Sequence, residues 1–129
     1  MGVEKTGITF YEAVGGAPAF ERLVARFYEG VATDPVLRPL YPEPDLAGAQ
    51  ERLRLFLIQY WGGPTTYSDT RGHPRLRMRH ASRSAGPIAK GAWLHHMTEA
   101  VESLELPPDL EAPLMTYLQG AAEAMMNRR

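Results

Sequence analysis

The chain has 129 residues, of which 44% are hydrophobic and 22% are charged, as is typical of one soluble globular domain. The net charge of −1 excludes a general attraction to nucleic acid or to an anionic membrane surface. Without cysteine, the chain forms neither disulfides nor thiolate metal sites, which fits a cytoplasmic location. No apolar run reaches the roughly 18 residues needed to span a membrane. We expect a single domain over residues 1–129, with residues 1–8 as a flexible extension.

Two helices are predicted in the first third of the chain. Thr9 and Glu12 have the spacing of a capping box, and the glycines 15–16 end the short helix that follows. Pro18 suits the first turn of a second helix. Apolar residues then recur with helical spacing and form one wide stripe. The stripe consists of Phe20, Leu23, Val24, Phe27, Tyr28 and Val31.

A short element and a further helix are predicted next. Asp34 and Pro35 are a cap followed by a first-turn proline, and Pro42 ends that element. Asp45 caps the following helix, which residues 62–64 terminate with two glycines and a proline. Its apolar face consists of Ala49, Leu53, Phe56, Leu57 and Tyr60.

The second half of the chain predicts a loop and three more helices. Residues 62–73 form the loop, and Pro74 opens a short helix that runs through His80. Pro87 opens the next helix, and the prolines 107–108 end it. The face of this helix consists of Trp93, Met97, Ala100, Val101 and Leu104, and that of the last helix of Leu114, Tyr117, Leu118, Ala121 and Met125. Strand alternation is absent, so the predicted fold class is all-α.

Several motifs occur in the order known from one protein family. They are residues 10–16, 26–28, 40–42, 60–64 and the cationic segment 71–80, with Trp93 thirteen residues after His80. From about Thr9 to Leu104 the chain therefore resembles the group II truncated haemoglobins of bacteria. The resemblance implies a two-over-two helical sandwich around haem b.

His80 is the candidate ligand of the haem iron. It ends the cationic segment, and small Ala81 beside it leaves room for a porphyrin face. From the residues alone, a surface histidine in a basic loop is the better interpretation, whereas the resemblance places the family's proximal histidine here. His73 is expected in a turn or on the propionate side. His95 and His96 point about 100° apart on one helix, so we expect one buried, one exposed and no metal pair.

The resemblance also implies which residues line the distal side of the haem. Ala49 matches the position where globins often have a histidine, and it donates no hydrogen bond, although its small size leaves an entrance for small ligands. Tyr28, Tyr41 and Trp93 are then the candidate donors to a bound gas. Their alternative role is simply that of core residues. The predicted haem contacts are Tyr28, Tyr41, Ala49, Arg52, Leu53, Phe56, Tyr67, Met78, Arg79 and Trp93.

Five arginines lie between residues 71 and 83, and two propionates would need cationic partners. Arg79 is the first candidate, Arg52 the second, and Tyr67 is a candidate hydrogen-bond donor. The alternative is a solvated basic loop, and a nucleic-acid site is not expected because the rest of the chain is not basic.

The chain departs from the family pattern after His80. Residues 81–85 lack the usual proline, aromatic and branched aliphatic residues, and Thr65, Gly91 and Pro113 depart elsewhere. We interpret these changes as a diverged or laboratory-evolved variant with a widened proximal opening, suited to haem carbene or nitrene transfer.

The predicted function is binding of O₂, CO and NO at the iron, with redox chemistry such as NO dioxygenation or peroxidase-like turnover. A reductase is an expected partner, and the chain is expected to be a monomer or homodimer. The alternatives are an oxygen store or gas sensor, and a helical module that has lost its haem.

Overall fold

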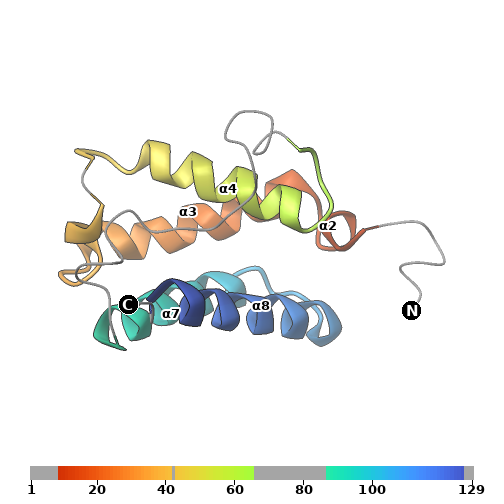
Figure 1. The fold of residues 1–129 in the computed structure, drawn as a ribbon. Helices are drawn as coiled ribbons and strands as arrows, with labels where there is room; N and C mark the ends of the chain where they lie inside the picture. The colour runs from red at the N-terminus through yellow and green to blue at the C-terminus, as the bar shows by residue number, and fades with distance from the viewer. Residues whose placement is uncertain (1–8, 42, 66–86, 127–129) are drawn as a thin grey trace.

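The computed structural model describes residues 9–41, 43–65 and 87–126, and for residues 124–126 it describes the backbone alone. Helices in two layers make up this part of the protein. The helices are α2 (Phe10–Ala13), α3 (Ala17–Thr33), the 3₁₀ helix η1 (Arg38–Leu40), α4 (Ala47–Tyr60), α7 (Pro87–Glu102) and α8 (Pro108–Met126). In Figure 1, α3 and α4 form one layer, and α7 and α8 form the other. The predicted all-α, two-over-two architecture is confirmed, and no strand occurs in the described ranges.

The predicted capping box at the start of α2 is present. The amide of Glu12 donates to Oγ1 of Thr9 at 3.1 Å, and the amide of Thr9 donates to Oε1 of Glu12 at 3.3 Å. Gly15 and Gly16 follow with φ angles of 117° and 74°, which glycine adopts without strain. These residues end α2 as predicted, and α3 begins directly after them with Pro18 in its first turn.

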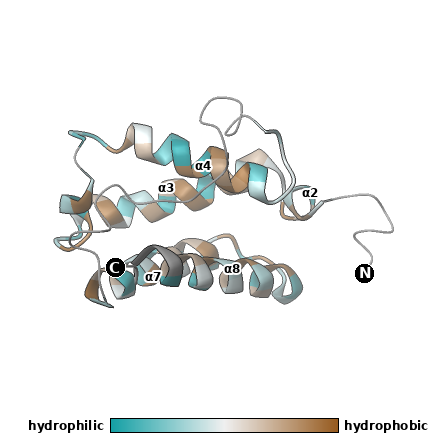
Figure 2. Cartoon of the chain, viewed as in Figure 1, coloured by the Kyte–Doolittle hydropathy of each residue, from teal (hydrophilic) through white to brown (hydrophobic). Residues whose placement is uncertain are grey.

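Helix α3 lies at the centre of the fold because its apolar stripe faces three neighbours. All six residues of the predicted stripe are buried. The helix packs against α4 and η1 on one side and against α7 in the other layer. Figure 2 shows apolar positions recurring along α3 between hydrophilic ones, as a period of 3.6 residues requires.

Helix α4 follows the prediction except at its two ends. Oδ1 of Asp45 accepts a hydrogen bond from the amide of Ala47 at 3.0 Å, but the cap position itself belongs to Leu46. Of the predicted apolar face, Tyr60 is an exception because it is 51% exposed. The face reaches the last residue of the helix, where the opposing layer no longer covers it completely.

The glycine after α4 lets the middle of the chain approach its beginning. Gly62 has a φ of 105°, and a Cβ placed there would lie 2.8 Å from Cβ of Thr9. The amide of Tyr11 donates to the carbonyl of Trp61 at 2.9 Å. The capping box of α2 is thereby docked against the end of α4.

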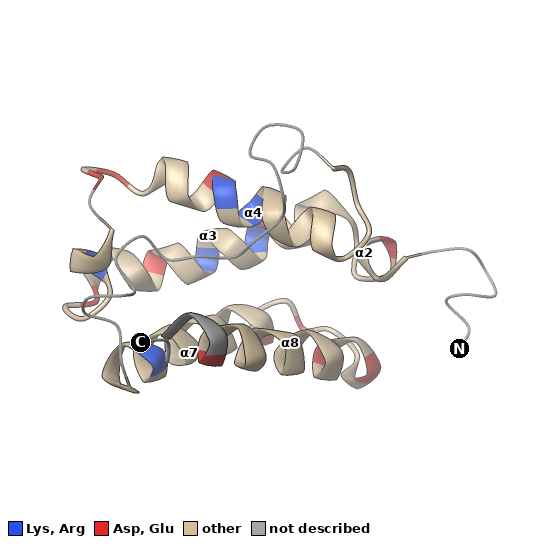
Figure 3. Cartoon of the chain, in the orientation of Figure 1, with Lys and Arg blue, Asp and Glu red and all other residues tan. Residues whose placement is uncertain are grey.

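Helices α7 and α8 form the second layer as predicted. Trp93, Met97, Ala100 and Val101 are buried on α7, and Leu104 beyond its end is half-buried. Helix α8 begins at Pro108 with acidic residues in its first turn, where the helix dipole favours them (Figure 3). Its predicted face is buried at Leu114 and Leu118, whereas Tyr117 and Ala121 are half-buried and Ala122 lies deeper. The side chain of Met125 lies outside the description.

Pro113 lies inside α8, so it does not shift the start of the helix. The predicted short helix from Pro74 to His80, the loop residues 66–73, and the extension 1–8 lie outside the described residues. Within the described ranges, no helix combines the length and apolarity that crossing a bilayer requires.

Candidate functional site

Two tyrosines meet between α3 and the segment after η1. Tyr28 is almost fully buried on α3, and its ring contacts that of Tyr41 edge-on with centroids 5.6 Å apart. Burial raises the pKa of Tyr28 well above its usual value and that of Tyr41 to about 12. Both phenols therefore keep their protons at neutral pH.

The two phenols are close enough to influence each other's ionisation, and the proximity of Tyr41 adds to the rise in the pKa of Tyr28. Each phenol carries one O–H group that can donate a hydrogen bond. The pair is therefore suited to present a phenolic proton to a small bound molecule.

The backbone that carries Tyr41 is held by an arginine that the sequence analysis missed. Nη1 of Arg38 donates to the carbonyl of Tyr41 at 2.8 Å. Its Nη2 donates to the carbonyls of Glu43 and Pro44, both at 2.9 Å. One guanidinium binds three carbonyls within four residues of the loop because its donors form a rigid fork. No motif marks Arg38, since its partners are backbone atoms that any residue supplies.

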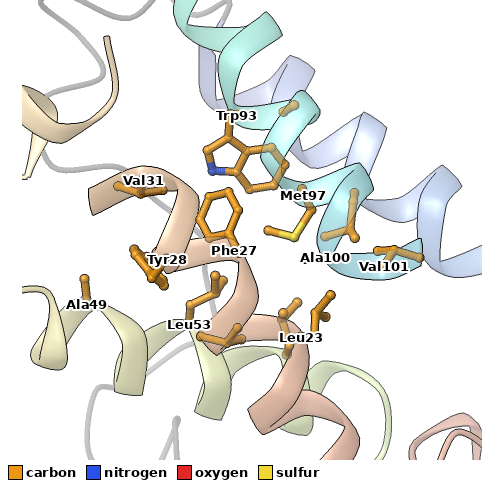
Figure 4. Packing of buried hydrophobic residues seen from close by; sticks show 14 of the residues in the cluster. Leu23, Phe27, Tyr28, Val31, Ala49, Leu53, Trp93, Met97, Ala100 and Val101 are labelled. Atoms are coloured by element: carbon orange, nitrogen blue, oxygen red, sulfur yellow. The ribbon is translucent and has the colours of Figure 1, made fainter. Parts of the chain in front are cut away.

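Trp93 approaches the tyrosine pair from α7 through an intervening ring. Its indole is 2% exposed and meets Phe27 with centroids 5.5 Å apart at 65°, and Phe27 meets Tyr28 at 4.9 Å and 76°. Figure 4 shows the indole nitrogen turned away from Met97. We call Tyr41, Tyr28, Phe27 and Trp93 the distal cluster. The structure thus brings together all three predicted donors and adds Phe27.

An apolar wall lies beside the distal cluster on α4. Ala49, Leu53 and Phe56 are all buried, and they recur at intervals of three and four residues on one helix face. In Figure 4, Ala49 and Leu53 lie on the side of α4 that faces α3. They supply apolar surface with no hydrogen-bonding group, and their contact with haem stays a prediction.

An open pocket of about 540 Å³, lined in part by Tyr28, lies between α3 and residues 44–50. Three alanines line it, which explains the hollow, together with Glu29, Arg38 and Gln50. Ala49 is not part of its lining. Entry of small ligands past Ala49 therefore stays a prediction.

Arg52, the second candidate for a propionate, already has an acidic neighbour. Its Nη2 lies 3.6 Å from Oε2 of Glu43, and about a third of each side chain is exposed. Exposed pairs of this kind are weak, typically about 0–1 kcal/mol, so the pair does not prevent a haem carboxylate from binding Arg52. Its role stays a prediction.

The remaining predicted haem contacts lie outside the described residues. They are Tyr67, Met78, Arg79 and the iron ligand His80, together with His73 and the other arginines of the cationic segment. The departures at residues 81–85, and with them the widened proximal opening, also lie there.

His95 and His96 differ in burial as predicted. The side chain of His95 is 63% exposed, whereas that of His96 is 15% exposed. Possible metal-ligand atoms of both rings and of Glu99 lie within 4.8 Å of one another. However, Nε2 of His96 lies 2.7 Å from Oδ2 of Asp34, and Glu99 pairs with a guanidinium of α3. Two of the three candidate metal ligands, His96 and Glu99, are therefore already paired with other side chains.

The described residues suit one face of a large, flat, apolar cofactor. They combine a buried aliphatic and aromatic wall with two protonated phenols and an indole, and no buried charged side chain occurs among them. Such a lining suits a macrocycle whose bound ligand accepts hydrogen bonds.

Comparison with known proteins identifies the family. The bacterial-like globin family matches residues 9–127. A group 2 truncated haemoglobin of Bacillus subtilis, YjbI, is 36% identical over 118 residues, which cover 92% of this chain and 88% of that protein.

Solved structures agree with this match. A thermostable haemoglobin from Thermobifida fusca is 63% identical, with a TM-score of 0.88 over 93% of this chain and 98% of that one. The haemoglobin of Chloroflexus aurantiacus is 50% identical, with a TM-score of 0.85 over 93% and 98%. The chain belongs to the bacterial-like globins as a group II truncated haemoglobin, a haem b protein whose ligands are diatomic gases such as O₂.

Proposed function

We propose that this globin retains O₂ tightly and uses it for redox chemistry, foremost the conversion of NO to nitrate, rather than for bulk oxygen delivery. The observation that carries the proposal is the distal cluster, in which two phenols meet edge-on and the ring of Phe27 joins them to a buried indole. Haem, when bound, supplies the iron at which a diatomic gas is held. His80, outside the described residues, is the proposed axial ligand on the strength of the resemblance.

The distal cluster acts on the bound gas through hydrogen bonds. Tyr41 and Trp93 would donate hydrogen bonds to a gas held at the haem, while the ring of Tyr28 packs against that of Tyr41. Each such bond is worth about 1–2 kcal/mol, or roughly tenfold in the rate of ligand loss. Leu53 and Phe56 keep water from competing for these donors.

Slow release favours turnover over transport. One NO, one O₂ and one electron from a reductase give one nitrate, so the proposal requires an electron donor as partner. In the described ranges the distal cluster contains no paired acid and base of the kind that would assist peroxide cleavage. This favours NO dioxygenation over efficient peroxidase turnover. CO is expected to bind as well, but it gains less from the donors because it carries less charge.

The test is to measure O₂ dissociation and NO consumption in the reduced holoprotein. Trp93→Phe and Tyr41→Phe are expected to speed O₂ loss by about tenfold each. Tyr60→Phe, which removes a phenol from a half-exposed ring, is the matched control and leaves both rates unchanged. Rapid O₂ loss in the unmodified protein, with slow NO consumption, would instead indicate an oxygen store or gas sensor. Protein that stays colourless with ample haem would indicate a helical module without cofactor.

A further inference from the structure

A carboxylate at the end of α3 binds a histidine of the opposite layer. Oδ1 of Asp34 accepts from the amides of Val36 and Leu37 at 2.7 and 3.0 Å, and Oδ2 lies 2.7 Å from Nε2 of His96. Burial opposes ionisation of Asp34, but the hydrogen bonds from His96 and the two amides outweigh it and lower its pKa. The contact joins residues that are 62 positions apart in the chain.

A glycine on α3 supports the other edge of the same imidazole. A Cβ placed at Gly30 would lie 2.2 Å from Nδ1 of His96, so any side chain there would displace the ring. Glycine is a poor residue for a helix interior, and α3 continues for three residues beyond it. Nδ1 is itself buried without a hydrogen-bond partner. The ring is therefore fixed by backbone on one side and by carboxylate on the other.

This contact lies next to the distal cluster. His96 follows Trp93 by three residues on α7, and Gly30 follows Phe27 by three residues on α3, so each pair lies within one helical turn. Phe27 and Trp93 are themselves in ring contact. The imidazole and the indole therefore lie within one turn of α7, where this helix packs against α3.

The other polar contacts at this crossing are weaker. Arg26 and Glu99 lie 3.1 Å apart, and His95 and Glu99 lie 3.4 Å apart, but these side chains are 38% exposed or more. Solvent screens such pairs, and they leave each side chain free to choose other geometries. Among the described polar contacts, the one between His96 and Asp34 is short and largely buried.

We propose that Asp34, Gly30 and His96 form a positioning contact, which we call the interlayer clasp, that holds Trp93 in the orientation from which it donates to the bound gas. The clasp fixes the rotation and the axial position of α7 against α3. Without it, α7 can shift and the indole N–H moves away from the ligand. The inference rests on the proposed function, because it concerns how one of the proposed donors is placed.

The first experiment measures O₂ dissociation and the C–O stretching frequency of the CO complex, which responds to distal hydrogen bonds. His96→Ala is expected to speed O₂ loss about three- to tenfold, within the range of one hydrogen bond, and to shift the C–O stretch. His96→Gln restores part of the effect because its amide can donate to Asp34. His95→Ala, a matched change on the neighbouring residue, leaves both measurements unchanged.

The decisive comparison repeats His96→Ala in the Trp93→Phe background. If His96 acts through Trp93, the second substitution adds no further increase in the O₂ dissociation rate. An equal increase in both backgrounds would overturn the proposal, and so would an unchanged rate for His96→Ala when Trp93→Phe alone speeds release. If no donor substitution changes release, the proposed function fails instead.

A second experiment tests the clasp independently of gas binding. Gly30→Ala is expected to lower the thermal midpoint of the holoprotein because the new methyl group displaces the imidazole. In the His96→Ala background the same substitution is expected to raise the midpoint, because alanine is the better helix former. A change of the same sign in both backgrounds would contradict the close packing of His96 on Gly30.

Discussion

Two groups of aromatic rings occupy different parts of the molecule, and they differ in the surroundings of their polar groups. In the distal cluster Phe27, Tyr28 and Trp93 are buried, and the phenol of Tyr28 meets that of Tyr41 edge-on. The second group, which we call the end cluster, joins α2, the end of α4 and α8. It consists of Phe10, Tyr60, Trp61 and Tyr117.

The end cluster packs at least as closely as the distal cluster. Phe10 and Trp61 have centroids 4.2 Å apart, as do Tyr60 and Tyr117. Half of Tyr60 is in solvent, and Nε1 of Trp61 is buried without a partner. Close ring contacts and a buried N–H group therefore also occur outside the proposed site. The distal cluster differs because its two phenols meet beside a buried apolar wall.

The largest expected effect concerns the binding of haem next to the distal cluster. His80→Ala is expected to abolish most haem retention, because it removes the proposed axial nitrogen. The measurement is the Soret absorbance per chain after reconstitution. His95→Ala is the control, since that ring is largely exposed, and loss of haem from this control alone would refute the assignment of His80.

The next largest effect compares how much each cluster contributes to the stability of the fold. Phe27 is fully buried, so Phe27→Ala is expected to lower the free energy of unfolding by about 3–5 kcal/mol. Tyr60→Ala is expected to lower it by less than about 1.5 kcal/mol, because half of that ring is already in water. Denaturant titration measures both values. Equal losses would mean that the end cluster is as important to the core as the distal cluster.

Alkaline pH should weaken the fold through the phenols of the distal cluster. The pKa of Tyr41 is raised to about 12 in the folded protein, from the usual value of 10.0. The folded state thus holds its proton more firmly, so this contribution is complete below pH 10 and disappears as the pH rises toward 12. Tyr41→Phe is expected to reduce the slope of stability against pH in this interval. An unchanged slope would place Tyr41 in solvent.

Acidic pH should have a smaller effect, at the interlayer clasp. Because the folded-state pKa of Asp34 is lowered, its stabilisation is present above the unfolded-state value near 3.8 and is lost as the pH falls through the folded-state value. Wild type should therefore exceed Asp34→Asn in thermal midpoint at pH 7, and the difference should shrink below about pH 4. A difference that persists in strong acid would exclude the carboxylate charge as its source.

Much of the fold could be predicted because it depends on local rules. The stripe on α3 needed only a helical period, and the capping box at Thr9 needed only a spacing of three residues. The exposure of Tyr60 could not be predicted in this way. Periodicity gives the direction of a side chain but does not say where the opposing layer ends.

The site was predictable where a family pattern existed and not where contacts join distant residues. Tyr28, Tyr41 and Trp93 came from the resemblance, and the structure places them together. The contact between Asp34 and His96 had no motif. One signal was nevertheless present: Gly30 lies inside a helix, where glycine is unfavourable, and such a glycine often marks a close approach.

The three carbonyls held by Arg38 have a consequence for anyone who wishes to retune this protein. The loop is stabilised by a side chain outside the distal cluster, whereas the proposed donors to the ligand are the phenols and the indole. Different residues therefore supply the proposed hydrogen-bond donors and hold the loop in place. A designer can exchange the phenols for other groups and keep the loop intact, provided that Arg38 is retained. Lysine is no substitute, because its single ammonium group cannot reach three acceptors with the same fork geometry.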